Sequence, residues 1–125
     1  EQLAAFDRLH CIGHEIRNGG VRLIGTSGTV TTLAGVVLNL PRYNRALVDG
    51  RRIPAEAADE ALTELFAMGR KGLVAHPCVG PERADYVLPG CAVYAAIRRL
   101  WPVEEVTVAD RGLREGMLMR LMRSA

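Results

Sequence analysis

The sequence predicts a helix-rich α/β fold with two short parallel strands. Residues 21–24 form a short apolar run, and residues 105–109 alternate between apolar and polar side chains, as strands do. Segments with apolar residues at helical spacing precede, separate and follow these two runs. Strands separated by helices pair in parallel through right-handed crossovers. A length of 125 residues with 49% hydrophobic content indicates one domain with a core of its own.

The first half of the chain predicts three helices. Residues 1–17 form one helix that ends at Asn18-Gly19-Gly20, and a second helix runs from about residue 28 to residue 40, where Pro41 stops it. Residues 42–52 form an exposed basic connection, and Pro54 opens a third helix. The inward faces of the first and third helices are expected to contain the following residues: Leu3, Phe6, Leu9 and Ile16, and Ala58, Leu62, Leu65 and Phe66.

The second half predicts a loop over residues 69–80, a helical turn from Pro81, and two further helices on either side of the second strand. Val93, Ile97 and Leu100 define the apolar side of the fourth helix. The last helix carries its apolar residues at helical spacing, and its methionines are expected to fill the core. These residues are Leu113, Met117, Leu118, Leu121 and Met122.

Charge and composition set limits on the partners. A formal net charge of +2, spread along the chain, gives no indication of a nucleic acid or a membrane surface as partner. No apolar run approaches the roughly 20 residues of a membrane span, so a cytoplasmic location is the default expectation. Three widely spaced cysteines predict free thiols. His10 and His14 lie four residues apart, but no third ligand accompanies them, so no metal site is predicted.

The stretch Gly25-Thr26-Ser27-Gly28-Thr29 lies between the first strand and the second helix. Its glycines allow a tight turn, and the N-terminus of the helix presents backbone N–H groups that suit an anion or a phosphate. A purely structural interpretation is also open, in which Thr26 or Ser27 caps the helix and the glycines only make the turn.

Two short strands make a marginal sheet with two bare edges. The chain also begins at Glu1, without methionine, inside a predicted helix. We therefore expect that further strands of the sheet lie in an N-terminal segment outside this chain.

Four patches resemble, in their order and spacing, the Ppx/GppA family of exopolyphosphatases and guanosine pentaphosphate phosphohydrolases. They are the helix that leads into the first strand and the stretches "GTSGTVTTLAG", "ERADYVLPGCAVYAAI" and "VTVADRGLREGML". The resemblance covers essentially all 125 residues and corresponds to the C-terminal part of the phosphatase domain. It implies a ribonuclease-H-like lobe, similar to those of actin, the sugar kinases and the heat-shock chaperone ATPases. Residues 1–125 would form the second lobe, and the first lobe is absent from this chain.

The resemblance also implies an activity. Family members hydrolyse phosphoanhydride bonds of inorganic polyphosphate or guanosine pentaphosphate, generally with Mg²⁺, and full-length members often form homodimers. The catalytic carboxylate is expected in the first lobe, so this chain is expected to contain no catalytic residue and to be inactive alone. The alternative is a sensor module that binds nucleotide or polyphosphate without catalysis. The sequence does not distinguish the two substrates.

Phosphate-binding residues are expected at three places. By the resemblance, Gly25, Thr26, Ser27, Gly28 and Thr29 face the ligand cleft. Arg83 is suited to a bidentate grip on phosphate oxygens, although a solvated charge at a helix start is the alternative. Asp110 and Arg111 follow the second strand, where α/β sheets gather ligands, and Arg114 follows on the last helix. The basic residues 42, 45, 51 and 52 are expected to be a solvated loop rather than a guide for a polyanion.

Overall fold

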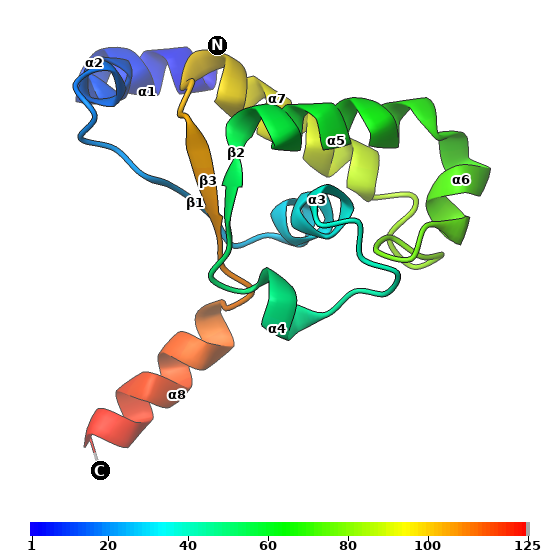
Figure 1. Ribbon diagram of the computed structural model, residues 1–125. Coiled ribbons are helices and arrows are strands. Elements are labelled where there is room, and N and C mark those ends of the chain that lie inside the picture. Colours follow the sequence, from blue (N-terminus) through cyan, green and yellow to red (C-terminus); the bar gives the residue numbers. More distant parts are fainter. Residues whose placement is uncertain (125) are drawn as a thin grey trace.

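Three strands and eight helices make up residues 1–124, the part of the chain that the computed structural model describes (Figure 1). In chain order they are α1 (Gln2–His10), α2 (Ile12–Arg17), β1 (Leu23–Gly25), α3 (Gly28–Val37), α4 (Arg45–Val48), β2 (Arg52–Pro54), α5 (Ala55–Ala67), α6 (Gly69–Ala75), α7 (Val87–Leu100), β3 (Glu105–Val108) and α8 (Leu113–Ser124).

The sheet has the strand order β1-β3-β2. β1 and β3 pair in parallel, with Leu23 opposite Val106 and Gly25 opposite Val108, so the predicted parallel pair is confirmed. The prediction of only two strands is wrong, because β2 pairs antiparallel with β3 from within the segment expected to be an exposed connection. β2 has only three residues, among them an arginine and a proline, so its sequence shows no recognisable alternation of apolar and polar side chains. Only Ile53 is buried in the core.

The core lies on one face of this sheet. Val106 and Val108 of β3 are fully buried, and the helices α3, α5 and α7 lie on their side of the sheet (Figure 1). α3 is the central helix, because it packs against α5, α7 and β3, and its residues 30–35 are all buried.

The two edges of the sheet differ. β2 ends in Pro54, which has no N–H to donate, and carries the exposed Arg52, and both features discourage pairing with a further strand. β1 has no such protection within residues 1–124. Because Gly25 directs its carbonyl to β3, the intervening Ile24 directs its N–H and C=O to the free edge, and its side chain is 57% exposed.

The first helix is broken, contrary to the expectation of one helix over residues 1–17. Cys11 adopts a left-handed conformation with φ of 55°, which ends α1 and starts α2 in a new direction. The carboxylate of Asp7 stabilises the break, since its Oδ1 accepts hydrogen bonds from the Gly13 N–H at 2.7 Å and from Trp101 Nε1 at 2.8 Å. The expected inward stripe of α1 is also wrong, because Phe6 and Leu9 are exposed.

The segment 69–80 is not the predicted loop throughout, because α6 occupies Gly69–Ala75. Gly69 has a φ of +65°, so the chain turns sharply there and resumes as a helix. Phe66, expected on the inner face of α5, is exposed. In α7 the buried residues are Val87, Cys91 and Tyr94, so the predicted face through the exposed Val93 is wrong by about one residue.

α8 differs most from expectation. It buries none of its residues against the rest of residues 1–124, and its methionines are exposed rather than part of the core. Figure 1 shows α8 projecting away from the sheet and the helices that cover it. The spacing of its apolar residues is correct for a packed helix, but the surface on which they would pack does not lie within residues 1–124.

The cysteines are free, as predicted: Cys11 is exposed, and Cys78 and Cys91 are buried. Across residues 1–124 we find no helix with the length and apolar character needed to cross a membrane.

Replacement of Gly25 by alanine is expected to destabilise the fold by about 1–3 kcal/mol, because the new methyl group would lie 2.5 Å from Val30 Cγ1. Urea unfolding followed by circular dichroism measures this loss. Gly116→Ala in α8 is the control, since nothing lies within 4 Å of its Cβ position and stability should not fall. Adding Val30→Ala to Gly25→Ala should cost less than Val30→Ala alone; equal costs would contradict the steric explanation.

Candidate functional site

The turn between β1 and α3 leaves the start of a buried helix open to solvent. Ser27 is the N-cap residue, in an extended conformation, and its side chain makes no capping hydrogen bond within residues 1–124. The first helical bond runs from the Thr31 N–H to the Ser27 carbonyl at 3.2 Å, so the N–H groups of Gly28 and Thr29 have no intrahelical acceptor. The interpretation of Ser27 as a side-chain cap is therefore wrong.

Two close contacts, one at Gly90 and one at Gly28, determine which residues surround this turn. A Cβ atom at Gly90 would lie 2.0 Å from Thr29 Oγ1, so α7 packs directly against the first turn of α3. The Thr29 side chain thus lies against α7, and its backbone N–H is available to a ligand. At Gly28 a Cβ would lie 3.8 Å from both Cζ and Nη1 of Arg83, which places the Arg83 guanidinium over the start of the helix.

Arg83 has no ion-pair partner among the residues that the structure describes. Its charge and the positive end of the α3 dipole act on the same exposed surface, formed by Thr26, Ser27 and Gly28. An arginine at such a position offers paired N–H donors that match two oxygens of one phosphate. Chemically, the arrangement suits an anion.

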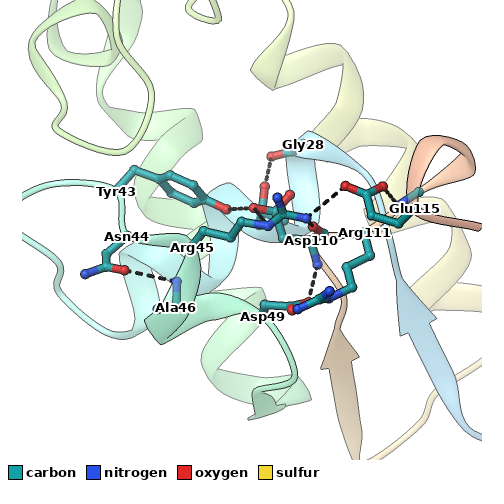
Figure 2. A network of polar contacts seen from close by, with 11 residues as sticks. Gly28, Tyr43, Asn44, Arg45, Ala46, Asp49, Asp110, Arg111 and Glu115 are labelled. Atoms are coloured by element: carbon teal, nitrogen blue, oxygen red, sulfur yellow. Dashed lines mark hydrogen bonds and ion pairs between the residues drawn. The ribbon is translucent and has the colours of Figure 1, made fainter. Parts of the chain in front are cut away.

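Asp110 lies beside the turn, because β1 and β3 run in parallel and end together. The Ala109 N–H donates to the Gly25 carbonyl at 2.9 Å, and Asp110 follows directly. The Asp110 carboxylate accepts a hydrogen bond from the Tyr43 hydroxyl at 2.6 Å and lies 3.6 Å from Arg45 Nε (Figure 2). Its backbone N–H donates to Asp49 Oδ1 at 2.9 Å.

Tyr43 connects these parts. Burial first, and then the hydrogen bond and negative charge of Asp110, raise the pKa of Tyr43 to about 12, against the opposing effects of Thr31 and Arg83. The phenol therefore remains a hydrogen-bond donor at neutral pH. Sequence reasoning missed this residue. A single aromatic side chain within the basic segment that follows Pro41 was the one available signal.

The remaining predicted residues are further from the turn or engaged elsewhere. Arg111 Nε donates to Asp49 Oδ2 at 2.7 Å, which lowers the pKa of Asp49. Arg114 is exposed on α8 and makes no hydrogen bond or ion pair with any other described residue. The structure thus brings together residues 25–29, Arg83 and Asp110, and it ties Arg111 to a neighbouring acid.

The basic segment that was expected to be a solvated loop is partly ordered by this network. Asn44 caps α4 through its side chain, which accepts from the Ala46 N–H at 3.0 Å. Arg45 pairs with Asp110 and also with Glu115 Oε1, at 3.1 Å. Glu115 Oε2 in turn accepts from the Gly112 N–H at 2.8 Å, so it closes the first turn of α8.

The described residues contain no cluster of acidic side chains that would hold Mg²⁺ by itself. No group of three or more His, Cys, Asp or Glu side chains converges anywhere in residues 1–124, and Asp110 already accepts from Tyr43 beside the Arg45 charge. Mg²⁺ in phosphate-transfer sites is held by one or two carboxylates together with substrate oxygens.

The mixed sheet with helices on one face, and with a glycine-rich turn where its parallel strands end, has the architecture of the actin-like α/β fold. Within that class the chain belongs to the Ppx/GppA phosphatase family, whose family model matches residues 2–125.

Two curated relatives are named as exopolyphosphatases. Exopolyphosphatase 2 of Mycobacterium tuberculosis is 26% identical over 102 residues, which are 78% of this chain and 32% of that protein. A putative exopolyphosphatase of Haemophilus influenzae is 26% identical over 125 residues, or 97% of this chain and 36% of that protein.

The crystal structure of the Aquifex aeolicus Ppx/GppA family member superimposes with a TM-score of 0.75 at 20% identity, over 99% of this chain and 42% of that one. Its type II variant gives a TM-score of 0.71 at 22% identity, over 87% and 38% of the two chains. This likeness shows the fold. The chain spans about a third of the length of its curated relatives and about two fifths of these structures.

The pKa of Glu115 tests the network at the start of α8. Backbone hydrogen bonds, from Gly112 first, and the Arg45 guanidinium lower this pKa from 4.5 to about 2. Because folding lowers the pKa, the charged Glu115 stabilises the folded arrangement above pH 4.5, and this contribution is lost as the pH falls through about 2.

Carboxyl NMR should therefore show Glu115 titrating near pH 2. Arg45→Met should raise its midpoint in part, since the Gly112 N–H remains. Arg70→Met, which removes an arginine paired with Asp85 instead, should leave the midpoint unchanged. A wild-type midpoint at the ordinary value for glutamate would contradict the network.

Proposed function

We propose that this chain is the second lobe of a phosphatase that hydrolyses phosphoanhydride bonds of inorganic polyphosphate, of guanosine pentaphosphate, or of both. Membership of the Ppx/GppA phosphatase family and two relatives named as exopolyphosphatases support the reaction class. The observation that carries the proposal is the open N-terminus of α3, with the unpaired Arg83 guanidinium over Gly28.

In this proposal the lobe binds and orients phosphate. Arg83 donates two parallel hydrogen bonds to oxygens of one phosphoryl group, and the N–H groups of Gly28 and Thr29 donate to another. Phosphoryl transfer requires charge stabilisation and positioning of an in-line water more than covalent help from the protein. The carboxylate that activates this water, and any residues that hold Mg²⁺, belong to polypeptide outside this chain.

Asp110 has a positioning role in this scheme rather than a direct contact with phosphate. Its negative charge repels a phosphate group, and its carboxylate is engaged by Tyr43 and Arg45. It keeps Tyr43 between α3 and the end of β3, and thereby limits the phosphate to the Arg83 side of the turn.

The first test is phosphate release by the gene product that contains this chain, with Mg²⁺, from long-chain polyphosphate and from guanosine pentaphosphate in parallel. Arg83→Ala is expected to lower kcat/KM by about 10- to 100-fold, the worth of a charge-assisted hydrogen bond to phosphate. Arg70→Ala is the matched control, because it removes an exposed arginine that pairs with Asp85, and activity should be unchanged. Equal effects of the two variants on kcat/KM would show that Arg83 is not part of the phosphate site.

Residues 1–125 alone are expected to release no phosphate from either substrate above a contaminant control, since the activating carboxylate lies outside them. Titration of the same preparation with polyphosphate should still show binding that weakens in Arg83→Ala and falls with salt. Hydrolysis by this preparation would overturn the division of roles. Binding without hydrolysis by the whole gene product would identify a sensor module instead.

A further inference from the structure

α8 presents an apolar surface for which residues 1–124 provide no cover. Leu113, Met117 and Leu121 follow one another at intervals of four residues, and the adjoining row consists of Arg114, Leu118 and Met122. All five apolar side chains are exposed, although this pattern is typical of a helix that packs on its apolar side. We call the surface that these five apolar residues form the α8 face.

A helix of this length does not hold itself together by local bonds alone. Isolated helices shorter than about 12–15 residues are marginal in water, and most helical stability in proteins comes from packing of the apolar side. α8 has 12 residues, and its described ties to the rest of the protein are polar and confined to its first turn, at Glu115. Beyond that turn nothing in residues 1–124 contacts it closely enough to bury a side chain.

The charges of α8 argue against a second copy as the cover. Arg114 lies within the α8 face and Arg120 at its edge, whereas Arg123 lies on the opposite side of the helix. The one acidic residue of α8, Glu115, is already paired with Arg45. Two such helices brought together would set arginines against arginines. A surface that complements the α8 face would therefore be apolar, with carboxylates opposite Arg114 and Arg120.

The Aquifex structure extends well beyond the part that matches this chain. The match covers 99% of this chain but only 42% of the Aquifex chain, so that protein contains much further polypeptide. The unprotected edge of β1, with its exposed Ile24, is a second surface left open on residues 1–124. The α8 face and the free edge of β1 are both surfaces that further polypeptide of the same protein could cover.

We propose that the α8 face docks on the polypeptide that Ppx/GppA family members carry beyond the stretch matched here, at an apolar surface that places acidic residues opposite Arg114 and Arg120. Because α8 begins directly after Asp110 and Arg111, this docking also fixes the end of β3 relative to the rest of the protein. The proposal concerns an interface and does not depend on the proposed hydrolysis.

The methionines of α8 provide a test with an internal control. Met117 and Met122 belong to the α8 face, whereas Met119 lies about 150° around the helix from its middle. Met117 and Met119 are 56% and 55% exposed, so their reactivity toward peroxide should be similar while the helix is uncovered.

The experiment is hydrogen peroxide oxidation followed by peptide mass spectrometry, on residues 1–125 alone and on the gene product that contains them. In the isolated chain the three methionines are expected to oxidise at comparable rates. In the gene product Met117 and Met122 should oxidise about tenfold more slowly, and Met119 within about twofold of its rate in the isolated chain. Equal rates for Met117 and Met122 in the two samples would overturn the proposal.

A second copy is distinguished by concentration. Slow oxidation that appears in residues 1–125 alone, rises with protein concentration and accompanies a dimer in sedimentation velocity would assign the α8 face to self-association and overturn the proposal. In the gene product, Leu121→Glu should restore rapid oxidation of Met117 and Met122, whereas Met119→Glu should not. The oxidation rates are read without substrate, so they remain informative if phosphate release is absent.

Discussion

The parallel pairing of β1 with β3 is the interaction on which the arrangement of the candidate site depends. It extends past the strands to the hydrogen bond from Ala109 to Gly25, so both chains leave the sheet at the same place. β1 is followed by the turn at the open N-terminus of α3. β3 is followed by Asp110, which belongs to the polar network around Arg45. A shift of one residue in this register would exchange the inward and outward side chains of β3 and separate the two turns.

Much of this arrangement was predictable because it rests on local chemistry. The glycine-rich turn, both parallel strands and the helices α3, α5 and α7 follow from spacing and from glycine and proline. β2 was not predictable, since three residues carry no period and Ile53 is ordered by its partner strand. Tyr43 was missed for a similar reason, because its hydrogen bond to Asp110 joins positions 67 residues apart.

The inward faces of α1 and α8 show a different limit. Periodicity identifies the apolar side of a helix, but it does not say whether the packing surface lies in the same chain. The α8 residues have the right spacing and remain exposed, and the inward-facing expectation for Phe6 and Leu9 fails in the same way. For Arg83 the chemistry of the side chain was predictable, whereas its position over Gly28 depends on how the segment that leads into α7 lies against α3.

The packing of α7 on α3 has a consequence for how the family can vary. A Cβ atom at Gly90 would collide with Thr29 Oγ1, so position 90 cannot gain a side chain unless the residue at position 29 becomes smaller. The two residues lie 61 positions apart but are expected to change as a pair among homologues. A larger residue at position 90 alone would tilt α7 and move Arg83 away from the turn. The resulting loss of binding would resemble the effect of losing Arg83 itself.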